Sequence, residues 1–175
     1  MKTLCSVVLL FLSLTPFVRA DEAQLDEKLQ PLKAFLGTWR GEFKNSTPEK
    51  PLVDISHWER ALNGKAIRIT HSINDGAYGG ETLVTWDAEK KSLVYHYFTT
   101  AAFMTKGTMR VDGKKLECHE NVTGSANGAT EVKSTYELRD DGTIHNVAKY
   151  FKDGSWDQGR EVTYKPAPNS RPIFK

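Results

Sequence analysis

The stretch Leu36-Gly37-Thr38-Trp39-Arg40-Gly41-Glu42-Phe43 marks the point where the chain changes from a helical to a strand pattern. Before it, leucines recur at helical spacing. After it, short runs rich in apolar and aromatic residues are separated by turn residues. A glycine ends the apolar turn, and a tryptophan is the first large side chain of the strand that follows. We therefore predict that this stretch is the first strand of a closed antiparallel sheet.

Residues 1–20 have the pattern of a secretory signal peptide. Lys2 supplies a positive start, residues 4–14 form an apolar run, and Val18-Arg19-Ala20 has the small-residue ending of a cleavage site. The run is shorter than the roughly 20 residues of a membrane-spanning helix. Cys5 lies at its start rather than its end, which argues against a lipid anchor. We expect cleavage after Ala20 and a secreted or periplasmic protein with no stable membrane anchor.

Residues 21–165 have the length of a single domain that can bury a core without covalent staples. Without Lys2 and Arg19, 22 basic residues face 22 acidic ones, which argues against a nucleic-acid partner. Cys118 is then the single cysteine, so no internal disulfide is possible, and we interpret it as a core residue. Prolines and polar residues predict a flexible tail over residues 166–175. The oligomeric state cannot be derived from the sequence.

Residues 21–35 predict two short helical pieces, because leucines recur at helical spacing and Pro31 interrupts them. Such a segment could close one end of a barrel. Downstream, Asn63-Gly64 predicts a hairpin between residues 54–62 and 65–73. Glu59 then lies opposite Arg68, as a solvated ion pair on the outer face. The inner face of the hairpin is predicted to hold Trp58, Arg60, Ile67, Ile69, His71 and Ile73.

The rest of the chain continues as strands joined by tight turns. The predicted strands cover residues 82–87, 93–100, 105–111, 114–120, 131–139, 143–151 and 156–164. In the last hairpins Tyr136 faces Asn146, Trp156 lies near Tyr150, and Arg160 lies near Asn146. No crossover is long enough for parallel pairing. We predict an all-β fold: an antiparallel up-and-down barrel of about nine to ten strands with a short N-terminal helical segment.

The opening Gly37-Thr38-Trp39-Arg40-Gly41 resembles the first strand of the calycins, which include lipocalins, fatty-acid-binding proteins and the haem-binding nitrobindins. The mature chain further resembles an uncharacterised family of secreted bacterial calycin-like barrels. The shared features are a Leu-Gly-x-Trp-x-Gly opening and a Tyr-or-Trp-Asp turn before an aromatic strand, here Trp86-Asp87 and residues 93–98. The resemblance implies structural roles for Gly37, Trp39 and Gly41, and for Arg160 as the arginine that packs over the tryptophan.

Nitrobindins use a late histidine as the iron ligand, and this chain departs from their pattern. Phe43 stands where they continue with glycine. Only His145 comes late, and the predicted register points it outward. We therefore expect no haem and no other cofactor, with haem binding kept as an alternative. His57 and Glu59 share a strand face, but no spacing fixes a third ligand, so we interpret them as part of a solvated face rather than a metal site.

Polar groups on the inner face are the residues that indicate a function. A charged group inside a barrel must be paired or bind a ligand, and Arg60 and His71 could together bind a carboxylate. The predicted ligand-binding residues are Trp58, Arg60, His71, Tyr95, Tyr97, Met104, Asn146 and Trp156. The competing interpretation is a filled barrel, in which Arg60 pairs with a buried acid such as Glu120 and Arg160 stacks on Trp39.

The function we predict is binding of a small, partly apolar ligand, with acids among the candidates, and no catalysis. No nucleophile elbow, zinc-binding His-Glu-x-x-His or phosphate-binding glycine loop occurs in the sequence. The first alternative is an enzyme that uses His71 as a base. It needs a carboxylate or a nucleophile within hydrogen-bonding reach of His71, which the sequence does not place. The second alternative is a filled barrel that acts as an interaction module.

Overall fold

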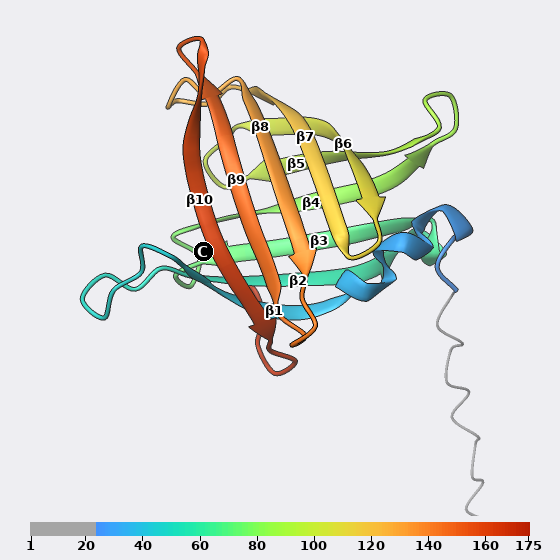
Figure 1. Cartoon of the computed structure of the whole chain (residues 1–175), viewed down its shortest axis with the longest axis horizontal. Helices are drawn as coiled ribbons and strands as arrows, with labels where there is room; N and C mark the ends of the chain where they lie inside the picture. Colours follow the sequence, from blue (N-terminus) through green and yellow to red (C-terminus); the bar gives the residue numbers. More distant parts are fainter. Residues whose placement is uncertain (1–23) are drawn as a thin grey trace, which may run out of the picture.

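The computed structural model describes residues 24–175, which form a closed antiparallel barrel of ten strands after a short helix (Figure 1). Each strand pairs with the next, and β1 also pairs with β10, which closes the barrel. This confirms the predicted fold class. The elements are η1 (Glu27–Phe35), β1 (Gly37–Phe43), β2 (Val53–Ala61), η2 (Leu62–Gly64), β3 (Ala66–Ile73), β4 (Tyr78–Asp87), β5 (Ser92–Thr99), β6 (Met104–Asp112), β7 (Lys115–Thr123), β8 (Glu131–Leu138), β9 (Ile144–Lys152) and β10 (Ser155–Pro166).

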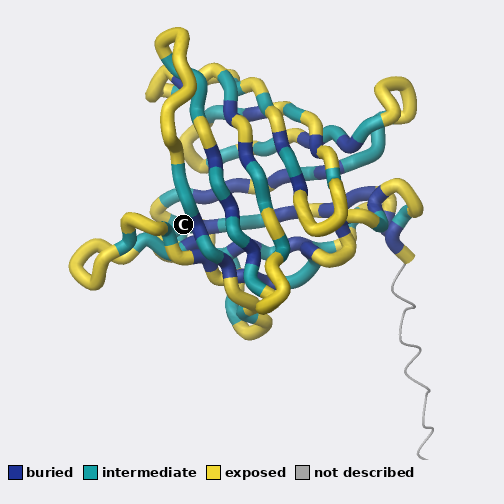
Figure 2. Tube along the Cα trace, in the orientation of Figure 1, coloured by how far each residue is buried: buried dark blue, intermediate teal, exposed yellow. Residues whose placement is uncertain are grey.

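The strands cross in two layers, with β7–β10 in front of β2–β5 in the view of Figure 1. Figure 2 shows buried residues recurring along the strands and exposed residues in the turns at both ends. The predicted register of the first hairpin is confirmed, with Trp58 paired to Ile69 and Glu59 to Arg68. Alternating side chains on these strands therefore point into the barrel and out of it.

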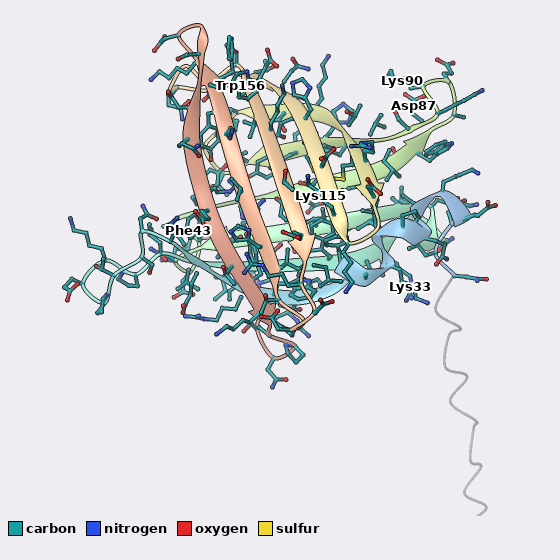
Figure 3. The ribbon with its side chains drawn as sticks, viewed as in Figure 1. Lys33, Phe43, Asp87, Lys90, Lys115 and Trp156 are labelled. Atoms are coloured by element: carbon teal, nitrogen blue, oxygen red, sulfur yellow. The ribbon has the colours of Figure 1, made fainter. Side chains whose placement is uncertain are left out.

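The final hairpin departs from the predicted register already at its turn, where Ser155 pairs with Lys152, and a bulge in β10 between Gln158 and Glu161 shifts the register by one further residue. Beyond the bulge, Val162 pairs with Asn146, but before it Trp156 pairs with Phe151. A one-residue shift moves side chains to the opposite face of a strand. Trp156 consequently lies outside the barrel, where Figure 3 labels it near the β9–β10 turn.

The helical segment η1 packs on the barrel through Leu29, Leu32 and Phe35, all of which are almost fully buried. Its N-cap, Asp26, accepts a hydrogen bond from the backbone of Lys28. η1 is one continuous 3₁₀ segment with Pro31 inside it, rather than the two pieces that the proline suggested. Neither helical segment within residues 24–175 is long and apolar enough to cross a membrane.

The end of the chain runs back along the outside of the barrel. After β10, the backbone of Ala167 donates to Thr38, and the backbone of Ile173 donates to the hydroxyl of Ser72. Both contacts lie in residues 166–175, the segment for which the sequence predicts a flexible tail. The predicted signal peptide, residues 1–20, lies outside the described residues.

Candidate functional site

The barrel encloses a cavity of about 380 Å³ to which strands from around the barrel contribute side chains. Its apolar wall includes Trp39, Trp58, Ile69, Met109, Val132 and Ile144. At one end, Phe35 of η1 packs against Trp58, with 5.8 Å between the ring centroids. The barrel therefore holds an internal space and is not completely filled by its own side chains.

The entrance lies at the end of the barrel away from η1. Phe43, Asn127, Tyr150 and Arg160 line both the cavity and an adjoining surface hollow beside the β1–β2 loop. Figure 3 labels Phe43 on the side of the barrel opposite Lys33 of η1. A ligand that enters past these side chains would reach the polar groups described next.

A chain of hydrogen bonds crosses one wall of the cavity. His71 Nδ1 lies 2.9 Å from Asp54 Oδ1, and His71 Nε2 lies 2.7 Å from the hydroxyl of Tyr97. The Tyr97 hydroxyl lies 2.8 Å from that of Tyr78, and Tyr164 donates to Asp54 Oδ2 at 2.7 Å. Four consecutive strands, β2, β3, β4 and β5, thus contribute the chain from Asp54 to Tyr78, and the distant strand β10 supports it through Tyr164.

Burial determines the protonation of Tyr97 and Tyr164, the tyrosines at either end of the His71–Asp54 pair. Desolvation raises the pKa of the Tyr97 hydroxyl and that of the Tyr164 hydroxyl, so both stay protonated at neutral pH. An ionised Asp54 can only accept hydrogen bonds, so it accepts one from Tyr164 and one from the Nδ1–H of His71. In neutral His71 the other nitrogen, Nε2, then accepts from Tyr97. The carboxylate that the enzyme alternative required near His71 is therefore present, as Asp54.

A second polar cluster lies on β5, β6 and β7. The hydroxyl of Thr105 donates to Glu120, and Tyr95 also hydrogen-bonds this carboxyl. Burial raises the pKa of Glu120, against the opposing effects of these hydrogen bonds and of the charge of Arg160. Glu120 therefore holds its proton to higher pH than an exposed glutamate does.

Arg160 is the permanently charged cation among the cavity-lining residues. Its Nε lies 3.5 Å from Oδ1 of Asn146, which is fully buried and donates from Nδ2 to the carbonyl of Thr135. Tyr136 lies within electrostatic reach of the guanidinium, and burial raises the pKa of Tyr136 to about 12. Asn146 on β9 therefore holds the guanidinium of Arg160 through Nε, while the charged group lines the cavity.

Three cavity tyrosines lie over glycines of neighbouring strands. A side chain at Gly41 would collide with the ring of Tyr164, one at Gly80 with Tyr97, and one at Gly159 with Tyr150. Aromatic side chains commonly cover glycines across a sheet in this way. Only Tyr95 and Tyr97 were predicted to line the cavity, so Tyr164 and Tyr150 were missed. The sequence signal for these two tyrosines was a glycine inside the neighbouring predicted strand, Gly41 and Gly159.

The predicted ligand-binding residues fall into three groups. Trp58, His71, Tyr95 and Tyr97 line the cavity together. Asn146 supports Arg160 from behind it. The structure does not bring the other three predicted residues into the cavity, namely Arg60, Met104 and Trp156.

Each of these three is displaced for an identifiable reason. By strand alternation Arg60 lies on the same face of β2 as Trp58, but it lies two residues further along the strand and is exposed. It pairs with Ile67 and His71 pairs with Ser56, so Arg60 and His71 do not converge. Met104 begins β6 at the rim. The register at the β9–β10 turn pairs Trp156 with Phe151 and places Trp156 outside, under the ammonium of Lys133 at 4.5 Å.

Replacing Glu120 with glutamine tests the buried carboxyl. Because the native pKa of Glu120 is raised above its ordinary value of 4.5, its stabilising contribution is complete below that pH and is lost as the pH rises through the native pKa. Glutamine stays neutral, so we expect the stability of E120Q relative to the unsubstituted protein to increase as the pH rises above 4.5. Denaturant unfolding at a series of pH values measures this. A difference that does not change with pH would contradict the assignment.

His57, considered above with Glu59 as a metal ligand, hydrogen-bonds Thr38 through Nδ1 and lies 3.6 Å from Glu59 through Nε2. Within residues 24–175, no cluster of three or more histidine, cysteine, aspartate or glutamate side chains is arranged to hold a metal ion. No protein-family model matches the chain, and no curated protein matches it significantly.

Proposed function

We propose that this protein binds a small, partly apolar ligand with an acidic group inside the barrel, and that Arg160 orients the acidic group. The observation that carries the proposal is a cavity of about 380 Å³ whose walls are mainly apolar and aromatic, with a guanidinium among them. Binding pockets for small molecules typically combine apolar walls with a few fixed polar groups. The secretory pattern of residues 1–20 and the resemblance to calycins would place this binding outside the cytoplasm.

The charges around the cavity favour an anionic ligand. Arg160 keeps its charge at any physiological pH, whereas the raised pKa of Glu120 favours its neutral form, which would not repel an anion. The hydroxyl of Tyr78, which also lines the cavity, can donate a further hydrogen bond to an oxyanion. The apolar wall formed by Trp58, Ile69 and Met109 provides the hydrophobic contribution to affinity.

The test compares two arginines on the same barrel, with 8-anilinonaphthalene-1-sulfonate as the probe because it is an apolar anion that fluoresces when shielded from water. In Arg160→Gln, the amide can still bond Asn146 but the charge is lost. We expect affinity for the probe to fall about tenfold to a hundredfold, as for loss of a charge-assisted hydrogen bond of about 1.5–3 kcal/mol. Arg60→Leu removes an exposed arginine outside the cavity and should leave affinity unchanged.

The opposite ranking, with R60L weakened and R160Q unaffected, would refute the role of Arg160. A native protein that does not bind the probe, and carries no small molecule in native mass spectrometry after purification from its own host, would refute the proposed function. Melting curves of both variants establish that the barrel is intact.

A further inference from the structure

The tyrosine–histidine chain, which comprises Tyr78, Tyr97, His71 and Asp54, ends at a hydroxyl on the cavity wall. Tyr97 is the one hydrogen-bond partner of the Tyr78 hydroxyl among the described residues. The ring of Tyr78 stacks on Phe103, with 6.4 Å between centroids, and lies edge-on to His71 at 5.9 Å. The Tyr78 hydroxyl can therefore form a second hydrogen bond with a molecule in the cavity.

We propose that this chain removes the proton of an acidic hydroxyl on the bound ligand, a phenol or an enol, and holds that proton on His71. The proposal rests on the ligand-binding function proposed above and narrows the ligand to this chemical class. Before the transfer, each hydroxyl of the chain donates its hydrogen bond to the next group on the side of His71.

Each proton moves by one position. The ligand O–H bond breaks and its proton goes to the oxygen of Tyr78, while the proton of Tyr78 goes to the oxygen of Tyr97. The proton of Tyr97 goes to Nε2 of His71, over the 2.7 Å that separates these two atoms. The result is a ligand oxyanion bonded to neutral Tyr78 and an imidazolium bonded to the carboxylate of Asp54. The net charge of the complex is unchanged.

The surrounding charges favour this product. The imidazolium gains an ion pair with Asp54, whose second oxygen is already bonded by Tyr164. On the other side, the charge of Arg160 acts on both Tyr78 and Tyr97 and lowers their pKa values, in opposition to the larger effect of burial. The same charge would stabilise an oxyanion bonded to Tyr78. Asp54, Tyr78, Tyr97, Tyr164 and Arg160 thus act together on the transferred proton.

The chemistry of the chain selects the ligand class. A carboxylic acid has a pKa of about 4 and is already ionised at neutral pH, so it needs no proton acceptor. A phenol or an enol keeps its proton near neutral pH and becomes an anion only if a base takes the proton. The aromatic rings of Tyr78, Phe103 and Tyr97 also provide flat surfaces on which an aromatic ligand can stack.

The experiment uses 4-nitrophenol, whose anion absorbs visible light, at a pH at which the free ligand is protonated. We expect the native protein to produce the anion band on binding. Tyr97→Phe interrupts the chain and leaves Arg160 in place, so the anionic fraction should fall at least about tenfold, which is one pKa unit. His71→Gln, the second variant, removes the acceptor and should give the same loss.

Two controls separate the proton chain from the cavity itself. Tyr136→Phe removes a cavity hydroxyl outside the chain and should retain the anion band. 4-Nitroanisole has no hydroxyl proton and should bind the native protein and Y97F equally.

The proposal is overturned if Y97F and H71Q keep the full anion band, because Arg160 alone would then account for ionisation. It is overturned as well if the native protein binds 4-nitrophenol only in neutral form, or binds the sulfonate probe but not 4-nitrophenol; in both cases the proposed binding function survives. Absence of binding by both probes, together with no small molecule retained in native mass spectrometry, would remove the proposed function itself.

Discussion

Replacing Phe35 with alanine is expected to lower the free energy of unfolding by about 3–5 kcal/mol, the range for truncating a buried phenylalanine. Its side chain is 1% exposed and joins η1 to the barrel through the ring of Trp58. Its carbonyl accepts the indole N–H of Trp39 at 2.9 Å, so the loop that enters β1 depends on the position of Phe35. Denaturant unfolding followed by tryptophan fluorescence measures the loss.

The matched control is Leu62→Ala on the β2–β3 turn, at the same end of the barrel as η1. Leu62 is 64% exposed, and its truncation should change stability by no more than about 0.5 kcal/mol. If F35A were as stable as L62A, η1 would not be packed as part of the core. F35A should also change affinity for the sulfonate probe, since Trp58 lines the cavity on its other side.

The fold was accessible from the sequence because antiparallel hairpins are local. In β6 and β7, the predicted face that holds Met109 and Cys118 is observed, with these two residues paired directly. In β8 and β9, Tyr136 faces Asn146 as predicted. Turn residues fixed each register, and the period-two alternation then assigned the faces.

Departures from regular strand and helix geometry could not be predicted from the sequence. The residues around the β10 bulge alternate on both sides of it, but the alternation changes phase between Gln158 and Glu161. A pattern extended through that point assigns Trp156 to the wrong face. The single 3₁₀ segment of η1 is likewise a result of packing, because burial of Leu29, Leu32 and Phe35 holds the chain together across Pro31.

For the site, the sequence predicted which face of a strand each residue lies on, but not how far along the barrel axis it lies. Arg60 and Trp58 share a face, but alternation does not show how far along the barrel axis each residue lies, and Arg60 is exposed. The hydrogen bond by which Tyr164 supports Asp54 was missed for a different reason. Asp54 and Tyr164 are 110 residues apart and meet because β1 joins β2 to β10, a contact that depends on barrel closure.

Gly41→Val is the second substitution from which we expect a large loss of stability, because Gly41 lies where β1 and β10 close the barrel. The first side-chain carbon at this position would lie 2.5 Å from the ring of Tyr164 and 2.7 Å from a methyl group of Val162, both on β10. Gly41 and Tyr164 are direct partners across the β1–β10 pair. Overpacking of this kind costs typically about 1–3 kcal/mol, and here it would strain the strand pair that closes the barrel.

The same substitution links the barrel seam to the site. A displaced Tyr164 would lose its 2.7 Å hydrogen bond to Asp54, which in turn holds His71. G41V should therefore lose stability and also weaken ionisation of bound 4-nitrophenol. Glu42→Val places the same side chain one residue later on the exposed outer face and should do neither. If G41V matched E42V in stability and ligand ionisation, the glycine would not be making room for Tyr164, and the chain from Tyr164 through Asp54 to His71 would not depend on the β1–β10 pairing.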